Sequence, residues 1–328
     1  MTGTIAFTIS YAGLDPCNTD SASAQITANI GSDGTCVATD ISGTWTSSLF
    51  GATADYAICG LEQSGSAGDN DNCLYPGTDG YSGGGLDYNG ITFSVVVNGT
   101  KYDVNIYNWG DGKYVETVYC GRDILCDGFV GFKERECSCF GHGTLIRTPD
   151  GDRAVEDLAP GDLVLTAQGS ALPVRWVGRS VVSSLFGDPL RILPVRIRAG
   201  ALGVNLPVRD LLLSPNHGVH LGDSLVQAGA LVNGTSIVRV RDMPIVFTYW
   251  HLELDTHALV LAEGVAAESF LDGVEEIGFQ NWDERSAPVA VRELPYPRVK
   301  SARQVPAALR RQIAAREASL FGDVADAA

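Results

Sequence analysis

The chain has 328 residues, of which 45% are hydrophobic and 19% are charged, a composition typical of a globular protein long enough for two domains. Its formal net charge is −16, and residues 1–138 carry most of it, with 17 Asp and Glu against 5 Lys and Arg. Nucleic acids and anionic membranes are bound through Lys and Arg, so this charge disfavours both as partners. No run approaches the ~20 apolar residues of a transmembrane helix.

Residues 1–138 are predicted to form a β-domain of short strands. The clearest signal is a hairpin over residues 91–97 and 102–107, because the Asn98-Gly99 pair readily adopts the positive φ angles of a type I′ turn. Residues 64–85 are rich in Gly, Asp and Asn and are expected to form a long surface loop. Inside it, residues 69–72 (Asp-Asn-Asp-Asn) offer oxygen ligands that calcium prefers, but the spaced loop with a terminal Glu is absent. A solvated turn is favoured, and no cofactor is predicted.

Seven cysteines in this first half suit a disulfide framework outside the cytoplasm, although their connectivity cannot be deduced from sequence. We therefore expect a secreted or cell-surface protein. The start of the chain has neither the basic region nor the apolar core of a secretory signal, so export is expected by a route without a recognisable N-terminal signal peptide. The seven are Cys17, Cys36, Cys59, Cys73, Cys120, Cys126 and Cys137.

The second half also reads as all-β, because strand-sized apolar runs are separated by Gly, Pro, Asn or Asp. These runs are residues 163–166, 174–177, 211–213, 237–240, 245–249 and 259–262. From about Phe270 the pattern dissolves. Residues 305–321 then predict a helix with Leu309, Ile313 and Leu320 at helical spacing, which we interpret as a C-terminal appendage.

Cys139 stands at the junction of the Cys-rich and the Cys-free halves and opens the first of four sequence blocks. Cys139-Phe140 is followed by Gly-Thr-Leu-Ile-Arg-Thr-Pro-Asp-Gly and by Pro-Gly-Asp-Leu-Val-Leu at residues 160–165. Ser214-Pro-Asn-His217, residues 249–257 and residues 262–272 complete the set. In order and spacing these blocks resemble the Hedgehog/intein (Hint) family, in particular its bacterial intein-like branch, over residues 139–275. The resemblance implies a horseshoe-like, pseudo-symmetric β-fold.

The residues make chemical sense together. A Cys139 thiolate that attacks the carbonyl carbon of Ser138 would convert an inert amide into a thioester, which is a better acyl donor. This N–S acyl shift needs a proton for the leaving amine, donors for the oxyanion and a base for the thiol. His217 is the candidate proton donor, since imidazole titrates near neutral pH and matches the family's block histidine. Ser214 would orient or polarise the scissile amide through its hydroxyl.

The late histidines are assigned by the resemblance. His251 falls where the family commonly carries a catalytic Asp or Cys, and His257 falls where it carries a histidine. Asp255 lies between them and could orient either ring. Each could instead be a strand residue with satisfied hydrogen bonds, and His142 and His220 are interpreted as incidental.

Three other interpretations of Cys139 stay open. It could be a structural half-cystine, or a relic nucleophile in an inactive domain. A strained bridge to Cys137, two residues away, could also mask the thiol until a reductant opens it.

This sequence differs from that of a splicing intein, and the difference limits the reactions that we expect. Inteins end with a His-Asn pair before Cys, Ser or Thr, whereas residues 266–270 read Ala-Ala-Glu-Ser-Phe and hold no Asn. Full splicing is therefore not expected. A thioester at Ser138 could be resolved by water, a thiol or an amine, and no cysteine after Cys139 could capture it. Residues 276–328 do not look like a sterol-binding segment, so the hedgehog acceptor is not carried over.

These observations predict a single-turnover autoprocessing protein that acts on its own polypeptide. Residues 1–138 would be the cargo, residues 139–275 the Hint-like domain, and residues 276–328 a linker and C-terminal helix. One alternative is an extracellular structural or adhesive protein with an inactive Hint-like scaffold. Another is a secreted effector or binding module in residues 1–138, whose release matters more than its acceptor.

Overall fold

The computed structural model describes most of the chain, and its contacts divide the chain into two compact units. The first is Met1–Glu134 with Val182–Asp188 and Pro244–Phe247, and the second is Arg135–Val181, Pro189–Met243 and Thr248–Ala328. The described residues are 3–13, 20–31, 36–62, 71–75, 85–86, 89–110, 113–120, 123–132, 138–184, 189–270, 279–286 and 292–322.

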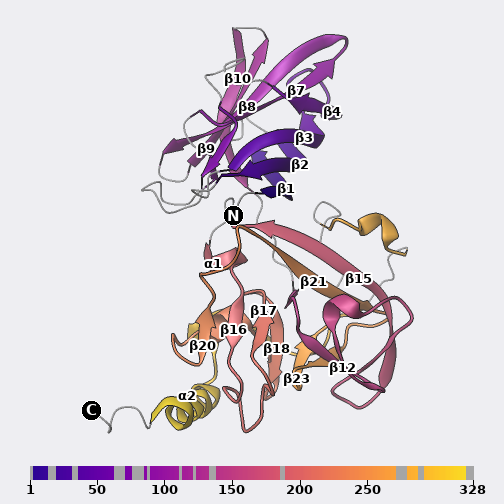
Figure 1. The fold of residues 1–328 in the computed structure, drawn as a ribbon, viewed down its shortest axis with the longest axis vertical. Coiled ribbons are helices and arrows are strands. Elements are labelled where there is room, and N and C mark those ends of the chain that lie inside the picture. The colour runs from indigo at the N-terminus through magenta and orange to yellow at the C-terminus, as the bar shows by residue number, and fades with distance from the viewer. Residues whose placement is uncertain are drawn as a thin grey trace. The chain divides into compact units, whose positions relative to one another are not determined.

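The first unit is one antiparallel sheet in which eight long strands follow one another in chain order (Figure 1). Pairing of β2 with β3 and of β1 with β10 closes these eight strands into a ring. Closed sheets of this size leave an interior just wide enough for side chains, and Trp45, Phe93 and Ile106 are buried there. The strands are β1 Gly3–Gly13, β2 Ser21–Ile30, β3 Cys36–Ser47, β4 Ala54–Leu61, β5 Cys73–Tyr75, β6 Gly85–Leu86, β7 Ile91–Val97, β8 Thr100–Gly110, β9 Lys113–Cys120 and β10 Asp123–Phe132.

The predicted hairpin is confirmed. Val97 pairs with Thr100 across the turn between β7 and β8, and Asn98 and Gly99 have φ angles of 52° and 82°. Most of the predicted loop over residues 64–85 lies outside the described residues. Its short strand β5 pairs with β3.

The less favoured calcium alternative and the predicted disulfide framework both stay untested. Asp69 and Asn70 fall outside the described part, while the carboxylate of Asp71 accepts hydrogen bonds from the Cys73 N–H and from the Asn89 side chain. No cluster of His, Cys, Asp or Glu suited to a metal, and no disulfide, occurs among the described residues. Cys17 and Cys137 are not described, so the disulfide framework remains a prediction.

The second unit is built on two seven-stranded sheets that share one hydrophobic core, to which Phe140, Val219 and Val260 belong. The first sheet has the order β14-β15-β21-β11-β17-β16-β20 and the second the order β13-β12-β22-β23-β18-β19-β24. The strands are β11 Phe140–Gly141, β12 Leu145–Thr148, β13 Gly151–Ala154, β14 Leu163–Leu165, β15 Ala171–Ser183, β16 Val195–Ile197, β17 Leu211–Leu213, β18 Gly218–Leu221, β19 Ser224–Gln227, β20 Ile237–Arg239, β21 Val246–Leu254, β22 Leu259–Ala262, β23 Val265–Glu268 and β24 Arg298–Val299. The α-helices are α1 Pro189–Ile192 and α2 Ala307–Phe321, and the 3-10 turns are Val155–Asp157, Ala228–Leu231, Trp282–Glu284 and Ala302–Gln304.

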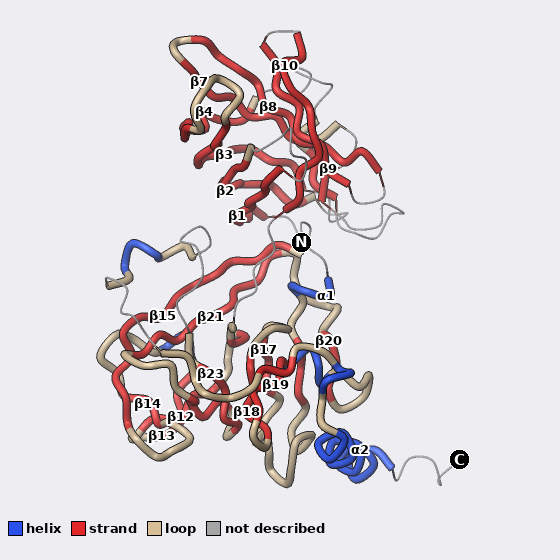
Figure 2. Tube along the Cα trace, turned by 180° about the vertical axis from the view of Figure 1, so that it is seen from behind, coloured by secondary structure: helices blue, strands red, loops and turns tan. Residues whose placement is uncertain are grey.

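The prediction of an all-β chain with a short C-terminal helix is confirmed. The interpretation of that helix as an appendage, however, differs from the structure. Strand β24 pairs in parallel with β19, and Val299, Val305 and Ile313 belong to the core of the second unit. Helix α2, drawn in blue in Figure 2, also donates hydrogen bonds to loop carbonyls. The Gln312 amide donates to Leu202 O at 2.8 Å, and the Arg316 guanidinium donates to Gly200 O at 2.9 Å. The end of the chain is therefore part of the unit that holds Cys139.

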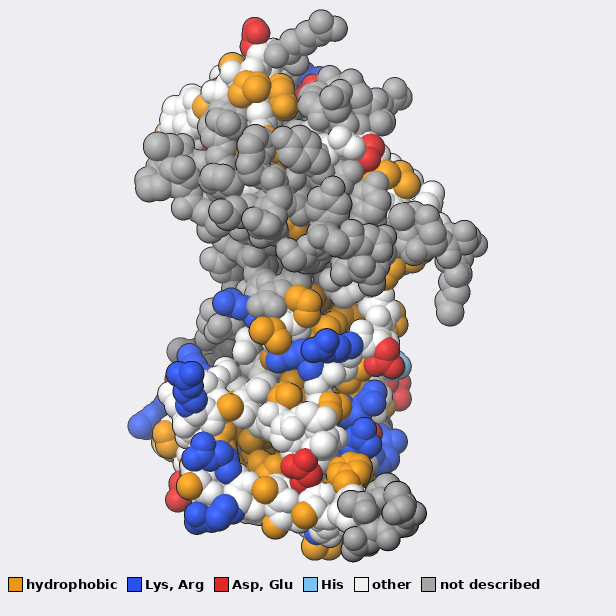
Figure 3. Space-filling model, turned by 90° about the vertical axis from the view of Figure 1, so that its left-hand side faces the viewer, with side chains coloured by type: hydrophobic (Ala, Val, Ile, Leu, Met, Phe, Trp, Pro, Cys, Tyr) orange, Lys and Arg blue, Asp and Glu red, His pale blue; other side chains and the backbone are white. Residues whose placement is uncertain are grey.

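No helix in the described part of the chain is long and apolar enough to cross a membrane. Figure 3 shows one face of the molecule, on which the Lys and Arg side chains of the second unit lie in several separate groups. The expectation that nucleic acid is not a partner stays a prediction.

Candidate functional site

Strand register brings Cys139 beside two residues that are distant in sequence. Strand β11 lies between β17 and β21, and Phe140 pairs with Leu213 on one side and with Trp250 on the other. Both pairings are antiparallel, so the residue before Phe140 faces the residue after each partner. Those residues are Ser214 and His251.

Hydrogen bonds and a close side-chain contact then join Cys139 to Ser214 and His251. The backbone N–H of Cys139 donates to Ser214 Oγ at 3.0 Å, and the N–H of Ser214 donates to the Cys139 carbonyl at 2.9 Å. Cys139 Sγ lies 2.8 Å from His251 Nε2. All three residues are buried, with 3%, 5% and 0% of Cys139, Ser214 and His251 exposed. The structure thus joins three of the predicted site residues around the nitrogen of the Ser138–Cys139 bond.

The ring of His251 lies against aromatic side chains. Phe270 and Phe279 contact it edge-on, with ring centroids 5.6 and 4.6 Å away. Its Nδ1 has no hydrogen-bond partner among the described residues. Water is therefore kept from the Cys139–His251 pair by a layer that includes a residue beyond position 275.

His217 ends the turn that carries the chain from β17 to β18. Its N–H donates to Ser214 O at 3.1 Å, and its ring packs on Phe140 with centroids 4.4 Å apart. The side chain is fully buried, and neither ring nitrogen has a hydrogen-bond partner in the described part of the chain. Burial lowers the pKa of His217 to about 4, and this outweighs the raising effects of Glu268 and of the Cys139 backbone. At neutral pH the imidazole is uncharged.

Glu268, at the end of β23, is the polar centre of the second sheet. Val219 pairs with Ala267, which places Glu268 opposite Gly218, and the Gly218 N–H donates to Glu268 Oε1 at 2.7 Å. A Cβ at Gly218 would lie 2.5 Å from that oxygen, so the contact requires glycine. The same oxygen accepts a hydrogen bond of 2.8 Å from the hydroxyl of Ser138.

Arg298 and His257 complete the surroundings of Glu268. The Arg298 guanidinium donates to both carboxylate oxygens, at 3.2 and 2.8 Å, and His257 Nε2 lies 3.2 Å from Oε2. Burial by itself would raise the pKa of Glu268, but the hydrogen bonds from His257 and Arg298 and the positive charge of Arg298 hold this pKa well below its usual range. Glu268 is therefore an anion.

The tautomer of His257 follows from its backbone contact. The N–H of Leu294 donates to His257 Nδ1 at 3.1 Å, so this nitrogen is an acceptor and carries no proton. The neutral ring then bears its proton on Nε2, which faces Glu268. His257 thus lies in the site region with its Nε2–H toward the carboxylate, 3.2 Å from Oε2.

The remaining predicted residues lie elsewhere or are not described. Asp255 has 63% of its side chain exposed and pairs with Arg175 at 3.4 Å, and no hydrogen bond joins it to His251 or His257 among the described contacts. His142 has 73% of its side chain exposed and pairs with Glu156. His220 packs on Tyr296. Cys137 falls outside the described residues, so the redox trap stays a prediction.

Sequence reasoning missed Glu268 and Arg298. Glu268 was noticed only as part of a stretch that lacks an intein's Asn. One signal could have found it, since it is the only charged residue in the otherwise apolar or small run from Val265 to Phe270. Arg298 gave no such signal, because only the pairing of β24 with β19 brings it to the site.

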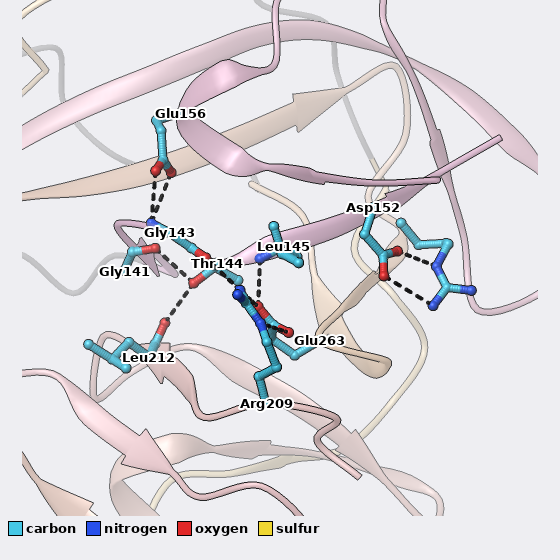
Figure 4. A network of polar contacts seen from close by, with 10 residues as sticks. Gly141, Gly143, Thr144, Leu145, Asp152, Glu156, Arg209, Leu212 and Glu263 are labelled. Carbon is cyan, nitrogen blue, oxygen red and sulfur yellow. Dashed lines mark hydrogen bonds and ion pairs between the residues drawn. The ribbon is translucent and has the colours of Figure 1, made fainter. Parts of the chain in front are cut away.

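The turn after Phe140 is fixed by a separate polar network (Figure 4). The N–H of Gly143 donates to both carboxylate oxygens of Glu156 at 3.0 Å, and the N–H of Leu145 donates to Glu263 at 2.8 Å. Arg209 holds Glu263 through two hydrogen bonds of 2.7 and 3.1 Å and donates to Gly143 O at 3.0 Å. The backbone that follows Cys139 is therefore held from several elements, as a precise site needs.

The site thus combines a buried cysteine near the start of an all-β unit with an imidazole beside its sulfur and a hydroxyl bonded to its amide nitrogen. Residues 138–274 match the family model described as the Hint domain. This part of the chain belongs to the Hint domain family, which supports autoprocessing as its general function.

Two further comparisons were made with known proteins. Among solved structures, the crystal structure of the MchDnaB-1 intein (N145AA) is similar at 17% identity, over 40% of this chain and 99% of that chain, with a TM-score of 0.28. No curated protein matches the chain.

Proposed function

We propose that the Hint domain cleaves its own chain by converting the Ser138–Cys139 peptide bond into a thioester. The observation that carries this proposal is the 2.8 Å contact between Cys139 Sγ and His251 Nε2, at the first residue of the domain. A thiol becomes a nucleophile when a base takes its proton, and this contact is within the reach of such a transfer.

The step moves one proton and exchanges one bond. His251 Nε2 accepts the thiol proton, and Cys139 Sγ bonds to the carbonyl carbon of Ser138 to give a tetrahedral oxyanion. When the oxyanion collapses, the C–N bond breaks and the Cys139 nitrogen takes up the proton as a free amine. The atoms balance without a co-reactant, because the products are the thioester and the new α-amine of the same residue.

Ser214 acts on the nitrogen side of this bond. Its hydroxyl accepts the Cys139 N–H at 3.0 Å, and its own N–H holds the Cys139 carbonyl. These two contacts fix the orientation of the amide nitrogen that must become the leaving group. Orientation of this kind lowers the entropic part of the barrier.

His217 acts as a neutral imidazole. With a pKa of about 4 it is not a cationic acid at neutral pH, so we assign it as a donor of a single N–H to the developing oxyanion or to the leaving amine. His257 acts through Glu268, to which its Nε2 proton is directed. Asp255 takes no step in this scheme.

The thioester then passes its acyl group to an external acceptor. Water would release residues 1–138 as an acid, and a thiol or an amine would carry them away as a conjugate. Splicing is not proposed, because residues 266–270 hold no Asn to cyclise.

The test is thiol-triggered cleavage of the purified chain. Dithiothreitol and hydroxylamine both intercept a thioester, so either should release residues 1–138 from the parent protein. Cys139→Ala should abolish release, and His251→Ala or His217→Ala should slow it by roughly 10²-fold or more. His142→Ala is the matched control, because this exposed histidine should leave the rate unchanged. Equal cleavage in Cys139→Ala would refute the proposal and leave an inactive scaffold as the interpretation.

A further inference from the structure

The acyl side of the proposed scissile bond is held by a side chain of its own. The Ser138 hydroxyl donates to Glu268 Oε1 at 2.8 Å, and Glu268 is only 1% exposed. On the other side of the same bond, Ser214 holds the Cys139 nitrogen. The two halves of the bond are thus fixed by separate elements, the nitrogen by the first sheet and the acyl residue by the second.

We propose that Glu268 is a positioning residue for autoprocessing, which holds the acyl group through the Ser138 hydroxyl and so selects a hydroxyl-bearing residue before the scissile bond. This inference rests on the proposed thioester step and adds to it the choice of acyl residue. Cys139 Sγ must approach the Ser138 carbonyl carbon along a narrow range of directions, and a fixed Ser138 side chain limits the rotation of that carbonyl.

The Glu268 carboxylate suits this positioning task because the groups that contact it are hydrogen-bond donors. Ser138, Gly218 and Arg298 donate to Oε1, and Arg298 donates again to Oε2, which His257 also faces. An ionised carboxylate accepts every one of these contacts, whereas a protonated one would present a donor to a donor. The titratable and charged groups that face Glu268 are His217, His257 and Arg298.

Arg298 extends the working site beyond the Hint match. It lies on β24, 24 positions after residue 274, and its guanidinium reaches both Glu268 and Glu293. Glu268 has no other full positive charge among the described contacts. The C-terminal segment therefore supplies, through Arg298, the positive charge that keeps Glu268 ionised.

A double-mutant cycle on the full chain tests the proposal, with dithiothreitol-triggered cleavage at pH 7 as the measurement. A hydrogen bond to a charged group is lost in Ser138→Ala, so cleavage should slow by roughly tenfold. Ser138→Thr keeps the hydroxyl and should recover most of the rate. In the Glu268→Gln background, Ser138→Ala should cost less than it does in the parent, because the amide oxygen of Gln offers the Ser138 hydroxyl a neutral contact in place of a charge-assisted one.

A purely structural role for Glu268 would slow cleavage without coupling to Ser138. Equal effects of Ser138→Ala in both backgrounds would therefore overturn the proposal, and so would a Ser138→Ala protein that cleaves at the parent rate. If Glu268→Gln fails to fold, Arg298→Met serves as the second background, because it removes the positive charge beside Glu268, and the Ser138→Ala effect should again shrink. A parent protein that cleaves no faster than Cys139→Ala would overturn the thioester step itself, which distinguishes the two failures.

Discussion

The most deeply buried described glutamate of the first unit and that of the second carry opposite charge states. Glu116 in the first unit and Glu268 in the second are both 1% exposed. Tyr11 and Trp45 donate hydrogen bonds to Glu116, and the negative charge of Asp20 lies nearby. Burial raises the pKa of Glu116 to about 8, with a further contribution from Asp20, and this outweighs the lowering effect of the Tyr11 hydrogen bond.

Glu268 is equally buried but has Arg298 beside it, and its pKa is held below the usual range. Burial disfavours the charged form in both units, so the difference comes from one cation and from the number of donors. In the first unit the carboxyl is a neutral hydrogen-bonding group inside a closed sheet. In the Hint domain it is an anion surrounded by hydrogen-bond donors, one of which is the hydroxyl of Ser138, next to the proposed scissile bond.

The largest expected effect is on the first unit. Since the folded pKa of Glu116 is raised to about 8, the folded state keeps a proton that the unfolded state has lost. This stabilisation is complete below the unfolded pKa of about 4.3 and is lost progressively as the pH rises to 8, a change of about 5 kcal/mol. Hydrogen exchange of β9 peptides between pH 5 and pH 9 measures it. Glu116→Gln should lack this slope, and an equal slope in that variant would contradict the assignment.

The second unit should respond to pH in the opposite sense through His217. Its folded pKa of about 4 lies below the unfolded value, so the folded state binds fewer protons in between. The stabilisation is complete above pH ~6.5 and is lost as the pH falls to 4, by about 3 kcal/mol. Urea unfolding of the full chain, followed by hydrogen exchange of peptides from β18, measures this loss of stability. His217→Gln should remove this part of the slope, and a variant as acid-sensitive as the parent would exclude His217 as its origin.

Removing the cation from the second glutamate should make it resemble the first. Arg298→Met leaves Glu268 with His257 and backbone donors, and we expect a loss of about 2–3 kcal/mol in unfolding free energy at pH 7, at or below the usual cost of breaking a buried pair because Arg298 reaches solvent. Arg147→Met is the matched control, since its partner Asp152 is exposed and the change should stay within about 1 kcal/mol. Equal effects of the two substitutions would mean that Arg298 does not set the charge of Glu268.

The all-β fold and the grouping of Cys139 with Ser214 and His251 could be predicted from sequence, but Glu268 and Arg298 could not. The Asn98-Gly99 hairpin and the strand over residues 211–213 follow from local turn chemistry and apolar runs, which sequence carries directly. The Cys139–Ser214–His251 group follows from block order, because the residues lie beside the central strand β11. Arg298 could not be found in this way, since a parallel pairing between β19 and β24 across more than 70 residues brings it into place.

Asp255 is another residue whose surroundings could not be predicted from sequence. Its position between His251 and His257 suggests a shared role, but alternation along the chain past β21 sends its carboxylate to Arg175 and solvent. We expect the smallest effect here. Asp255→Ala should change the unfolding free energy by less than about 1 kcal/mol and should not change the rate of thiol-triggered cleavage. A rate that drops by tenfold or more would return Asp255 to the site.

The most direct test of the account is the mass of the fragments released from the purified chain, with and without dithiothreitol. The proposed thioester step predicts one fragment that ends at Ser138, as an acid or a dithiothreitol adduct, and one that begins at Cys139, with neither formed by Cys139→Ala. Fragments with other ends, or the same fragments from Cys139→Ala, would contradict it.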